Sequence, residues 1–364
     1  MKPNTFTEAE KDRIEQDAFD SLDDDPVRDL LDSKRFRDDI EPPKEDPVIT
    51  CRGQTLGTAG NIGNIQGKTK TAKTTGPFQC ILAAAMGGYG DNVLDFGVNN
   101  PDHLPITYLD LEMSPYHFYR MVRGAMHRAG ITKLPPWINA YSLTDMSATK
   151  RMDALRRITE DQHRLIMVDG WADLMQDIND IDKATVFADE IQGRAIANEF
   201  HISGVLHENP GGGSGSKMRG HLGTIMANKG EFSLSCERDG DLIQMWTPLC
   251  RNRPIMQSEA IGMRYDERQG MFVKAANKAD IKRQDKTEEL TNVLVKIADG
   301  DANAAWRWAE LVECIMKAEK KSEPTAKRRI KELLGIKLIF QQSGTGYYHL
   351  VSQVKDRINE AQSQ

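Results

Sequence analysis

A stretch of glycine, lysine and threonine residues between positions 67 and 75 has the composition of a phosphate-binding loop. Gly67 opens the stretch, Lys73 and Thr74 stand near its end, and the apolar segment FQCILAAAM follows. The general pattern GxxxxGK[ST] joins a strand to a helix, and its backbone N–H groups bind phosphate oxygens. Its lysine reaches the terminal phosphates, and its hydroxyl ligates magnesium. The sequence therefore predicts a site for ATP and Mg²⁺ lined by Gly67, Thr71, Ala72, Lys73, Thr74 and Thr75.

One residue departs from this pattern, because Ala72 stands where the second glycine is usual. We expect the methyl group to be tolerated if the backbone φ angle of Ala72 is negative, although it can also weaken phosphate binding. The alternative interpretation is a lysine-rich loop that binds no nucleotide.

Two carboxylates follow short apolar runs that predict strands. The run LIMVD ends in Asp169, which suits the acid that holds magnesium through water at the carboxyl edge of a parallel sheet. The run ITYLDLE ends in Glu112, and a carboxylate beside the terminal phosphate can polarise the attacking water. The alternative role of Glu112 is to stabilise the N-terminus of the next helix. Asp110 is the second candidate base, but its alternation with Leu109 and Leu111 places it on the other face of the strand.

The segment from residue 47 to residue 275 alternates short apolar runs with amphipathic stretches. Such alternation predicts βαβ units, and hence an α/β domain with a mostly parallel sheet. The last three apolar runs, FSLSCERDG, LIQMWTPL and GMFVKAA, predict a meander of three strands at the edge of that sheet.

The charge of the chain is unevenly distributed. The 364 residues include 48 Lys and Arg against 54 Asp and Glu, a net charge of −6. Residues 1–45 hold 15 of the acidic and 8 of the basic side chains, which leaves 39 acidic and 40 basic in the remainder. Residues 1–46 therefore predict an acidic N-terminal arm, mobile or partly helical. The alternative is an arm that packs on a neighbouring subunit through its apolar side chains, which are Phe19, Leu22, Leu30, Leu31 and Phe36.

Cysteine use and hydropathy indicate the compartment. The five cysteines, at positions 51, 80, 236, 250 and 314, form no CxxC pair, which argues against a zinc site or a disulfide framework. No run approaches the ~20 apolar residues of a membrane-spanning helix, and the polar, acidic start is unlike a signal peptide. We therefore expect a cytoplasmic protein without membrane contact.

The end of the chain predicts a small separate module. Residues 276–300 are polar and charged and indicate a linker that leads into a helix. In residues 301–364, the amphipathic stretch AAWRWAELVECIMKAEK precedes a basic helix, and a β-hairpin follows around SGTG. This order is typical of a winged helix, a variant of the helix-turn-helix. The expected contacts to DNA are Lys327, Arg328 and Lys331, and the alternative use of such a module is protein binding.

The order of these motifs resembles the RecA-like core of hexameric DNA helicases. The similarity is greatest to the plasmid replicative helicases of the RepA type and the related ATPases of mobile elements. It covers residues 57–273 and is carried by the phosphate loop and by the segments LDLEMS, LIMVDG and VLHENP. The resemblance implies a RecA-like P-loop fold, ATP with Mg²⁺ as cofactor, and assembly into a homo-hexameric ring.

The resemblance also implies roles for individual residues. Glu112 falls on the catalytic carboxylate of the family. His207 falls on the polar residue that senses the γ-phosphate and couples it to the DNA-binding loops; its alternative is a hydrogen-bonded histidine at a strand end. Arg251 and Arg253 fall where the family has a Lys-x-Arg pair that completes the ATP site of the adjacent subunit, and the alternative is a solvated basic turn.

A Gly/Ser loop follows His207 and is closed by Lys217 and Arg219. In RecA-like rings the loop at this place projects into the central channel, so both basic residues are expected to bind the phosphates of single-stranded DNA. The alternatives are a plain connector and, for Arg219, a place in the ATP site of the neighbouring subunit.

Taken together, the sequence predicts a ring-forming, ATP-hydrolysing DNA motor, a helicase or translocase used in replication or transfer of a mobile element. Single-stranded DNA would pass through the ring, and duplex DNA would contact the winged helix. The alternative is a nucleotide-switched DNA-binding adaptor with little turnover that recruits partners. A P-loop small-molecule kinase is disfavoured because no acceptor-binding lid is apparent.

Overall fold

The protein is described here by a computed structural model, in which the chain divides into two compact units, residues 1–45 and 46–364. The residues that the structure describes are 26–41, 44–209 and 217–362.

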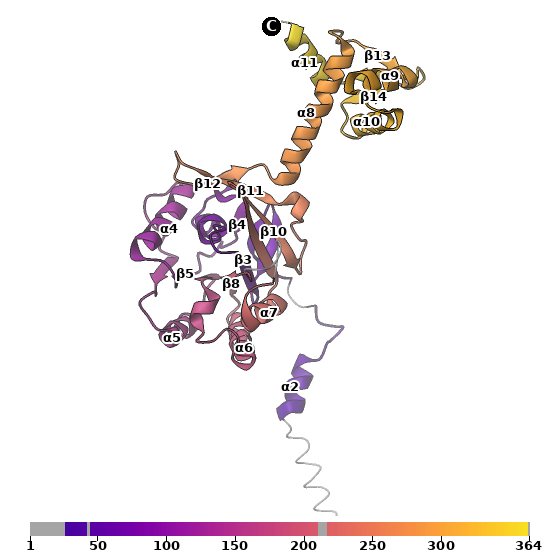
Figure 1. Cartoon of the computed structure of the whole chain (residues 1–364). Helices are drawn as coiled ribbons and strands as arrows, with labels where there is room; N and C mark the ends of the chain where they lie inside the picture. Colours follow the sequence, from indigo (N-terminus) through magenta and orange to yellow (C-terminus); the bar gives the residue numbers. More distant parts are fainter. Residues whose placement is uncertain (1–25, 42–43, 210–216, 363–364) are drawn as a thin grey trace, which may run out of the picture. The chain divides into compact units, whose positions relative to one another are not determined.

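The described part of the first unit contains one helix, α2 (Pro26–Lys34), drawn in indigo in Figure 1. Leu30, Leu31 and Phe36 are exposed in this unit. Phe19 and Leu22, the other two apolar residues expected to anchor the arm, lie outside the described residues.

The second unit is built on a nine-stranded sheet with the order β12-β11-β10-β9-β3-β8-β7-β5-β6. All pairings from β9 across to β6 are parallel, which confirms the predicted α/β fold with a mostly parallel sheet. The parallel strands are β3 (Ile62–Gly67), β5 (Ile106–Asp110), β6 (Ile138–Ser142), β7 (Leu165–Asp169), β8 (His201–His207) and β9 (Phe232–Asp239).

The antiparallel part of the sheet differs from the predicted three-stranded meander. Strand β9, the first of the predicted three, pairs in parallel with β3 and only on its other side in antiparallel with β10. Strand β11 was not expected, because its second half, Arg264 to Asp266, is polar and interrupts the apolar pattern. The antiparallel strands are β10 (Leu242–Cys250), β11 (Ile261–Asp266) and β12 (Met271–Ala275).

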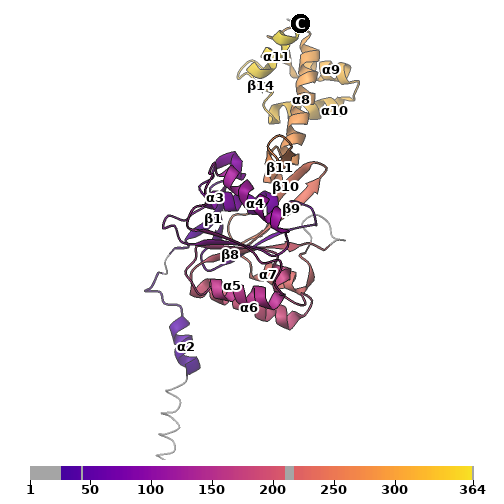
Figure 2. The same cartoon turned by 90° about the vertical axis from the view of Figure 1, so that its left-hand side faces the viewer.

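Helices cover both faces of the sheet and divide its core in two. Figure 2 shows α3 and α4 on one face and α5 and α6 on the other, and each set packs on its own group of buried apolar side chains. The α-helices of this region are α3 (Gln79–Ala85), α4 (Pro115–Arg128), α5 (Ala148–Ile158), α6 (Ile181–Ala197) and α7 (Gly220–Lys229). Short helical turns are η1 (Thr74–Phe78), η2 (Gly90–Val93), η3 (Trp171–Leu174) and η4 (Gln257–Glu259).

A second, small sheet has the order β2-β1-β4 and was not predicted. Its strands are β1 (Pro47–Cys51), β2 (Gln54–Thr58) and β4 (Phe96–Val98). The buried carboxylate of Glu231 connects β2 to the main sheet, because it accepts from the N–H and the hydroxyl of Thr58 at 2.7 and 3.1 Å.

The C-terminal segment forms a third apolar core around a three-stranded sheet of order β13-β15-β14. The predicted linker is mostly helical, since α8 (Lys278–Ala298) begins at the Asn277 cap and contributes Leu290 and Leu294 to this core. The predicted first helix of the module is shorter than expected, because its initial residues form β13. The other elements are β13 (Ala305–Arg307), α9 (Trp308–Glu319), α10 (Glu323–Gly335), β14 (Ile339–Gln341), β15 (Tyr347–Leu350) and α11 (Ser352–Gln362).

None of the helices in the described ranges is long and apolar enough to cross a lipid bilayer.

Trp171 joins the turn η3 to the centre of the sheet. The residue is fully buried, and a Cβ added to Gly204 of β8 would lie 2.1 Å from its indole ring. The ring also packs edge-on against Phe187 of α6, with centroids 6.0 Å apart. Gly204 therefore allows the indole of Trp171, which follows Asp169 by two residues, to approach the sheet closely.

We expect Gly204→Ala to destabilise the protein by about 2 kcal/mol, because the buried Trp171 cannot make room for a methyl group. The matched control is Gly193→Ala in α6, where an added Cβ has nothing within 4 Å. It should stabilise the helix by up to about 1 kcal/mol. Urea denaturation followed by circular dichroism measures both, and equal effects of the two substitutions would contradict this packing.

Candidate active site

The candidate residues meet because the parallel strands end at one edge of the sheet. Gly67, the last residue of β3, is in register with His207, the last residue of β8. Asp110 at the end of β5 is in register with Asp169 at the end of β7. The segments that follow these strands therefore lie together at the carboxyl edge, where open α/β sheets bind their ligands.

The ammonium group of Lys73 lies inside the 67–75 loop, and only 5% of the residue is exposed. Its Nζ donates to the carbonyl oxygens of Gly67 at 3.0 Å and of Lys68 at 2.9 Å. Burial lowers the pKa of Lys73, while the nearby carboxyl groups of Glu112 and Asp169 oppose that shift. Neutral carbonyl groups compensate a buried ammonium less well than an anion does. The loop thus presents a cation that a phosphate group can stabilise.

His207 is the third polar neighbour of Lys73, with its Nδ1 3.1 Å from Nζ. Burial lowers the pKa of His207, and the charge of Lys73 lowers it further. The lowered pKa favours the neutral imidazole, in which an unprotonated Nδ1 can accept a hydrogen bond from Lys73. Nε2 lies 3.9 Å from Oε1 of Glu112, so His207 stands between the lysine and the candidate base.

The φ angle of Ala72 is positive, not negative as we expected for a tolerated methyl group. Its value of +57° lies in the left-handed region that favours glycine. This conformation costs a non-glycine residue about 1–2 kcal/mol. The side chain of Ala72 packs against the main core, and that contact offsets part of the cost.

Gly67 is required for a close approach between the loop and β9. A Cβ at this position would lie 2.5 Å from the carbonyl oxygen of Cys236 and 2.6 Å from Oγ1 of Thr71. That hydroxyl donates to the carbonyl oxygen of Lys68 at 2.9 Å. Gly67 thus permits the close approach to β9, and Thr71 holds the turn of the loop through its bond to Lys68. The spacing of the motif alone does not reveal either contact.

Thr74 and Asp169 form the oxygen pair that the sequence predicted for a metal. Oγ1 of Thr74 donates to Oδ1 of Asp169 at 3.0 Å, and the hydroxyl of Tyr108 donates to Oδ2 at 3.3 Å. Burial raises the pKa of Asp169 to about 7, with a further contribution from the charge of Glu112. Hydroxyl and carboxylate oxygens are the donors that Mg²⁺ prefers, so the pair fits this ion. No group of three or more His, Cys, Asp or Glu side chains suited to a metal occurs within the described ranges.

Glu112 lies beside Asp173, a residue that the sequence analysis did not select. The two carboxyl groups are close enough to share a hydrogen bond, which requires one of them to be protonated. Both carboxylates converge on Gly170, where an added Cβ would lie 2.6 Å from Oδ2 of Asp173 and 3.3 Å from Oε1 of Glu112. Burial raises the pKa of Glu112 to about 7, and the charge of Asp173 adds to this. Arg151 Nη1 lies 3.5 Å from Oδ1 of Asp173 and anchors the pair.

Asp110, the second candidate base, is held by hydrogen bonds to the turn after β5. The residue is fully buried, and its Oδ1 accepts from the backbone N–H groups of Glu112 at 3.3 Å and Met113 at 3.0 Å. Its Oδ2 accepts from the Ser142 hydroxyl at 3.2 Å. The side chain thus fixes the turn that carries Glu112.

The segment after β8 brings Arg219 next to His207. The backbone N–H of Arg219 donates to the carbonyl oxygen of His207 at 2.8 Å, and that of Asn209 donates to the carbonyl oxygen of Lys217 at 3.2 Å. Lys217 and Arg219 are both exposed. Residues 210–216, the Gly/Ser loop expected to contact DNA, lie outside the described residues.

Arg251 and Arg253 are not part of this cluster. They follow Cys250, which pairs with Phe232 at the start of β9, and Phe232 pairs with Gly63 near the start of β3. The arginines are therefore at the amino edge of β3, whereas the 67–75 loop is at the carboxyl edge. Both are exposed, and Nη2 of Arg251 donates to the carbonyl oxygen of Lys229 at 3.1 Å.

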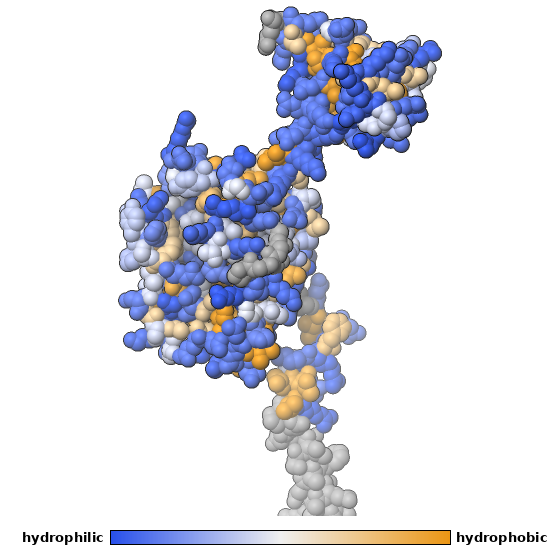
Figure 3. Space-filling view, in the orientation of Figure 1, coloured by the Kyte–Doolittle hydropathy of each residue, from blue (hydrophilic) through white to orange (hydrophobic). Residues whose placement is uncertain are grey.

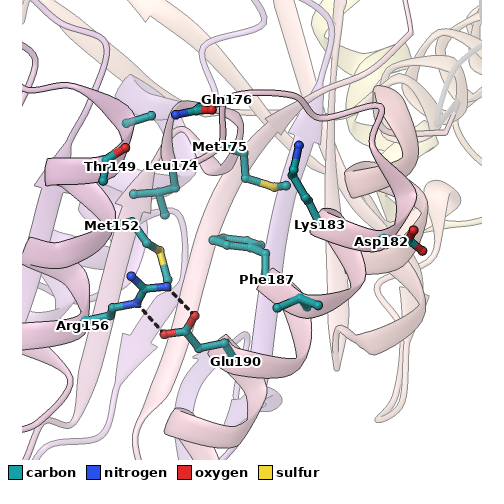
Figure 4. A pocket seen from close by; sticks show the side chains of 12 residues that line it. Thr149, Met152, Arg156, Leu174, Met175, Gln176, Asp182, Lys183, Phe187 and Glu190 are labelled. Carbon is teal, nitrogen blue, oxygen red and sulfur yellow. Dashed lines mark hydrogen bonds and ion pairs between the residues drawn. The ribbon is translucent and has the colours of Figure 1, made fainter.

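Three of the cavities in the described part of the second unit lie around the nine-stranded sheet. One of about 510 Å³ adjoins the loop through Lys68 and Thr71, and one of about 460 Å³ begins at the exposed Thr75 and extends to Tyr265. The third, about 410 Å³, is the apolar groove of Figure 4, where Arg156 of α5 and Glu190 of α6 form an ion pair. This groove contains none of the candidate residues.

The basic residues predicted on the second helix of the C-terminal module lie on α10, where acids neutralise two of them. Nζ of Lys327 is 2.7 Å from Oε1 of Glu323, and Nε of Arg328 is 3.7 Å from Oε1 of Glu332. Lys331 is exposed.

Neither the protein-family models nor the curated proteins of known function contain a match to this sequence.

We expect Ala72→Gly to stabilise the protein by about 1 kcal/mol, because glycine adopts the φ angle of +57° without the steric cost. The control is Ala154→Gly in α5, which should destabilise by about 1 kcal/mol in ordinary helical backbone. Urea denaturation of both variants measures the difference. A loss of stability in Ala72→Gly equal to that of the control would contradict the strain assigned to this position.

We expect the contribution of Glu112 to the stability of the nucleotide-free protein to fall as the pH rises from 4.5 to about 7. The folded pKa of Glu112 lies above its ordinary value, so the native state binds more protons than the unfolded chain in this window. Glu112→Gln removes that contribution and should flatten the fall. Glu267→Gln, which replaces an exposed carboxylate, is the control and should leave the pH dependence of stability unchanged. Parallel pH curves for Glu112→Gln and wild type, from urea denaturation, would exclude the raised pKa.

Proposed function

We propose that the chain is a ring-forming, ATP-hydrolysing DNA motor, with a RecA-like P-loop domain in residues 47–275 and a winged helix in residues 301–364. The observation that carries the proposal is the convergence of Lys73, the Thr74–Asp169 pair and Glu112 at one sheet edge. A phosphate-binding cation, a pair of metal-binding oxygens and a potential base are the parts that phosphoanhydride hydrolysis requires. The five free cysteines support a reducing cytoplasmic setting.

Binding of the nucleotide would begin at the loop. The Lys73 ammonium would exchange its bonds to the carbonyls of Gly67 and Lys68 for bonds to phosphate oxygens, which compensate its charge better. The hydroxyl of Thr74 and the carboxylate of Asp169 would hold Mg²⁺, which neutralises charge on the phosphates. The cavity that begins at Thr75 is large enough, at about 460 Å³, to receive the nucleoside.

Glu112 would act as the base that orients and deprotonates the attacking water. Its proton, now shared with Asp173, must first be lost, and a cation bound nearby favours that loss. His207 would report the state of the site, because its ring lies between Lys73 and Glu112 while its backbone carbonyl holds Arg219. Lys217 and Arg219 would then contact the phosphates of single-stranded DNA.

The position of Arg251 and Arg253 supports action on a neighbouring subunit. The two side chains are exposed at the sheet edge opposite to their own loop, so they cannot reach a phosphate bound there. In a homo-hexameric ring they would complete the next subunit's site and stabilise charge in the transition state.

The alternative function, a nucleotide-switched DNA-binding adaptor with little turnover, is favoured by one observation. Ala72 holds a methyl group in left-handed backbone inside the loop. Such a loop would bind nucleotide yet position the γ-phosphate poorly.

We expect DNA-stimulated ATPase activity in the wild type, and a loss of at least about 100-fold in Lys73→Ala and Glu112→Gln. Lys355→Ala, in α11 of the C-terminal module, is a control for loss of one lysine and should retain activity. Phosphate release with and without single-stranded DNA measures turnover, while nucleotide binding is measured separately. Binding without stimulated turnover in the wild type would favour the adaptor.

The same assay tests the ring. Glu112→Gln and Arg251→Ala/Arg253→Ala should each be inactive alone. Mixed subunits should regain activity, because a subunit with intact arginines can complete the site of a neighbour with an intact Glu112. If the mixture stays as inactive as its components, the arginines do not act between subunits.

A further inference from the structure

The sheet of the C-terminal segment has one buried and one open face. Trp306, Tyr348, Leu350 and Ile339 alternate along the strands and are buried in the third apolar core. The residues between them point to the opposite face. Those residues are Arg307 of β13, Tyr347 and His349 of β15 and Phe340 of β14.

The register places these four planar side chains side by side. Arg307 is opposite Tyr347 in the β13–β15 pair, and Phe340 is opposite His349 in the β14–β15 pair. The guanidinium carbon of Arg307 lies over the Tyr347 ring, 5.3 Å from its centroid. Phe340 stacks on His349 with ring centroids 5.6 Å apart and an angle of 25° between the planes. The face is therefore a row of ordered flat groups on a rigid sheet.

The face carries an exposed aromatic ring and a cation. Phe340 is 50% exposed, while Tyr347 and His349 are half-buried. Within the described residues, the guanidinium of Arg307 is in no ion pair, whereas Lys327 and Arg328 of α10 each lie close to a glutamate. The face thus offers an unpaired guanidinium and the accessible ring of Phe340.

The local charge indicates what could bind there. Residues 301–364 hold 11 Lys and Arg against 8 Asp and Glu, so the segment is net positive in an otherwise acidic chain. Anionic partners with flat, apolar faces match both the charge and the rings. Single-stranded nucleic acid has these properties, because its bases are unpaired and stack on aromatic and guanidinium planes.

We propose that the face formed by Arg307, Tyr347, His349 and Phe340 binds single-stranded nucleic acid by stacking on its bases. The exposed ring of Phe340 and the stacked Arg307–Tyr347 pair would each hold one base, and the positive charge of Arg307 would attract the adjoining phosphate. This surface is separate from the basic side of α10, and its binding does not depend on ATP or on the ring.

The test measures binding of the full chain, without nucleotide, to a fluorescent oligo-dT and to an abasic strand of the same length. The wild type should bind oligo-dT at least about tenfold more tightly, since only oligo-dT has bases to stack. Phe340→Ala should weaken oligo-dT binding about tenfold and leave abasic binding unchanged. Phe340→Trp should restore it. Tyr116→Ala, at a 66% exposed ring in α4, and Lys317→Ala, at a cation of α9, are the matched controls and should change neither.

Two outcomes would overturn the proposal. Equal weakening of oligo-dT and abasic binding in Phe340→Ala would show that the bases are not stacked on this face. Unchanged oligo-dT binding in both Phe340→Ala and Arg307→Ala would assign the face to a protein partner instead. Both results are independent of ATP turnover. A wild type without ATPase activity would therefore contradict the proposed motor function but not the proposed binding of single-stranded nucleic acid.

Discussion

The register of the parallel strands is the constraint on which the candidate site depends. Gly67 lies opposite His207 and Asp110 opposite Asp169, and the β7–β8 pairing of Val168 with Gly204 joins the two pairs, so four segments leave the sheet at its carboxyl edge. Strand β8 separates the loop strand from β7, and Thr74 nevertheless reaches Asp169 at 3.0 Å. A shift of one residue in any of these pairs would turn a polar end residue to the opposite face of the sheet. The packing of Trp171 against Gly204 secures β8 next to β7 at this level.

Burial then determines the electrostatics of the site. It raises the pKa of Asp169 and Glu112 to about 7 and lowers the pKa of Lys73 and His207. All four shifts favour the neutral form, because the folded site desolvates both signs of charge. Lys73 is therefore held by neutral carbonyl groups, and the protonated form of Glu112 is favoured. A phosphate would compensate the charge of Lys73 and a metal ion that of the carboxylates, which is why the arrangement suits the proposed nucleotide chemistry.

The C-terminal segment shows that charge counted along a sequence differs from charge available at a surface. Lys327 and Arg328 dominate the basic stretch, yet each has a glutamate one helical turn away. Arg307 is a single cation in an apolar context, yet strand alternation places it on the open face above Tyr347. Ion pairing along α10 and the alternation of side chains along β13 and β15 thus favour a different binding surface in this segment from the one that the basic stretch suggests.

Local patterns in the sequence were sufficient for the α/β fold with its mostly parallel sheet, because period and spacing act over a few residues. The same patterns did not reveal β11, whose second half is polar, or the small sheet in which β4 pairs with β1 from more than 40 residues further along the chain. Asp173 was missed for a similar reason. It lies in the turn after β7, whereas its partner Glu112 lies after β5, and the two meet only at Gly170 in the folded chain. The sign of the φ angle of Ala72 was left open by the sequence, because a residue type does not by itself specify its backbone conformation. The sequence by itself determined which residues could do chemistry, and the tertiary structure decided which of them share one environment, because pKa values and backbone strain depend on neighbours distant in the chain.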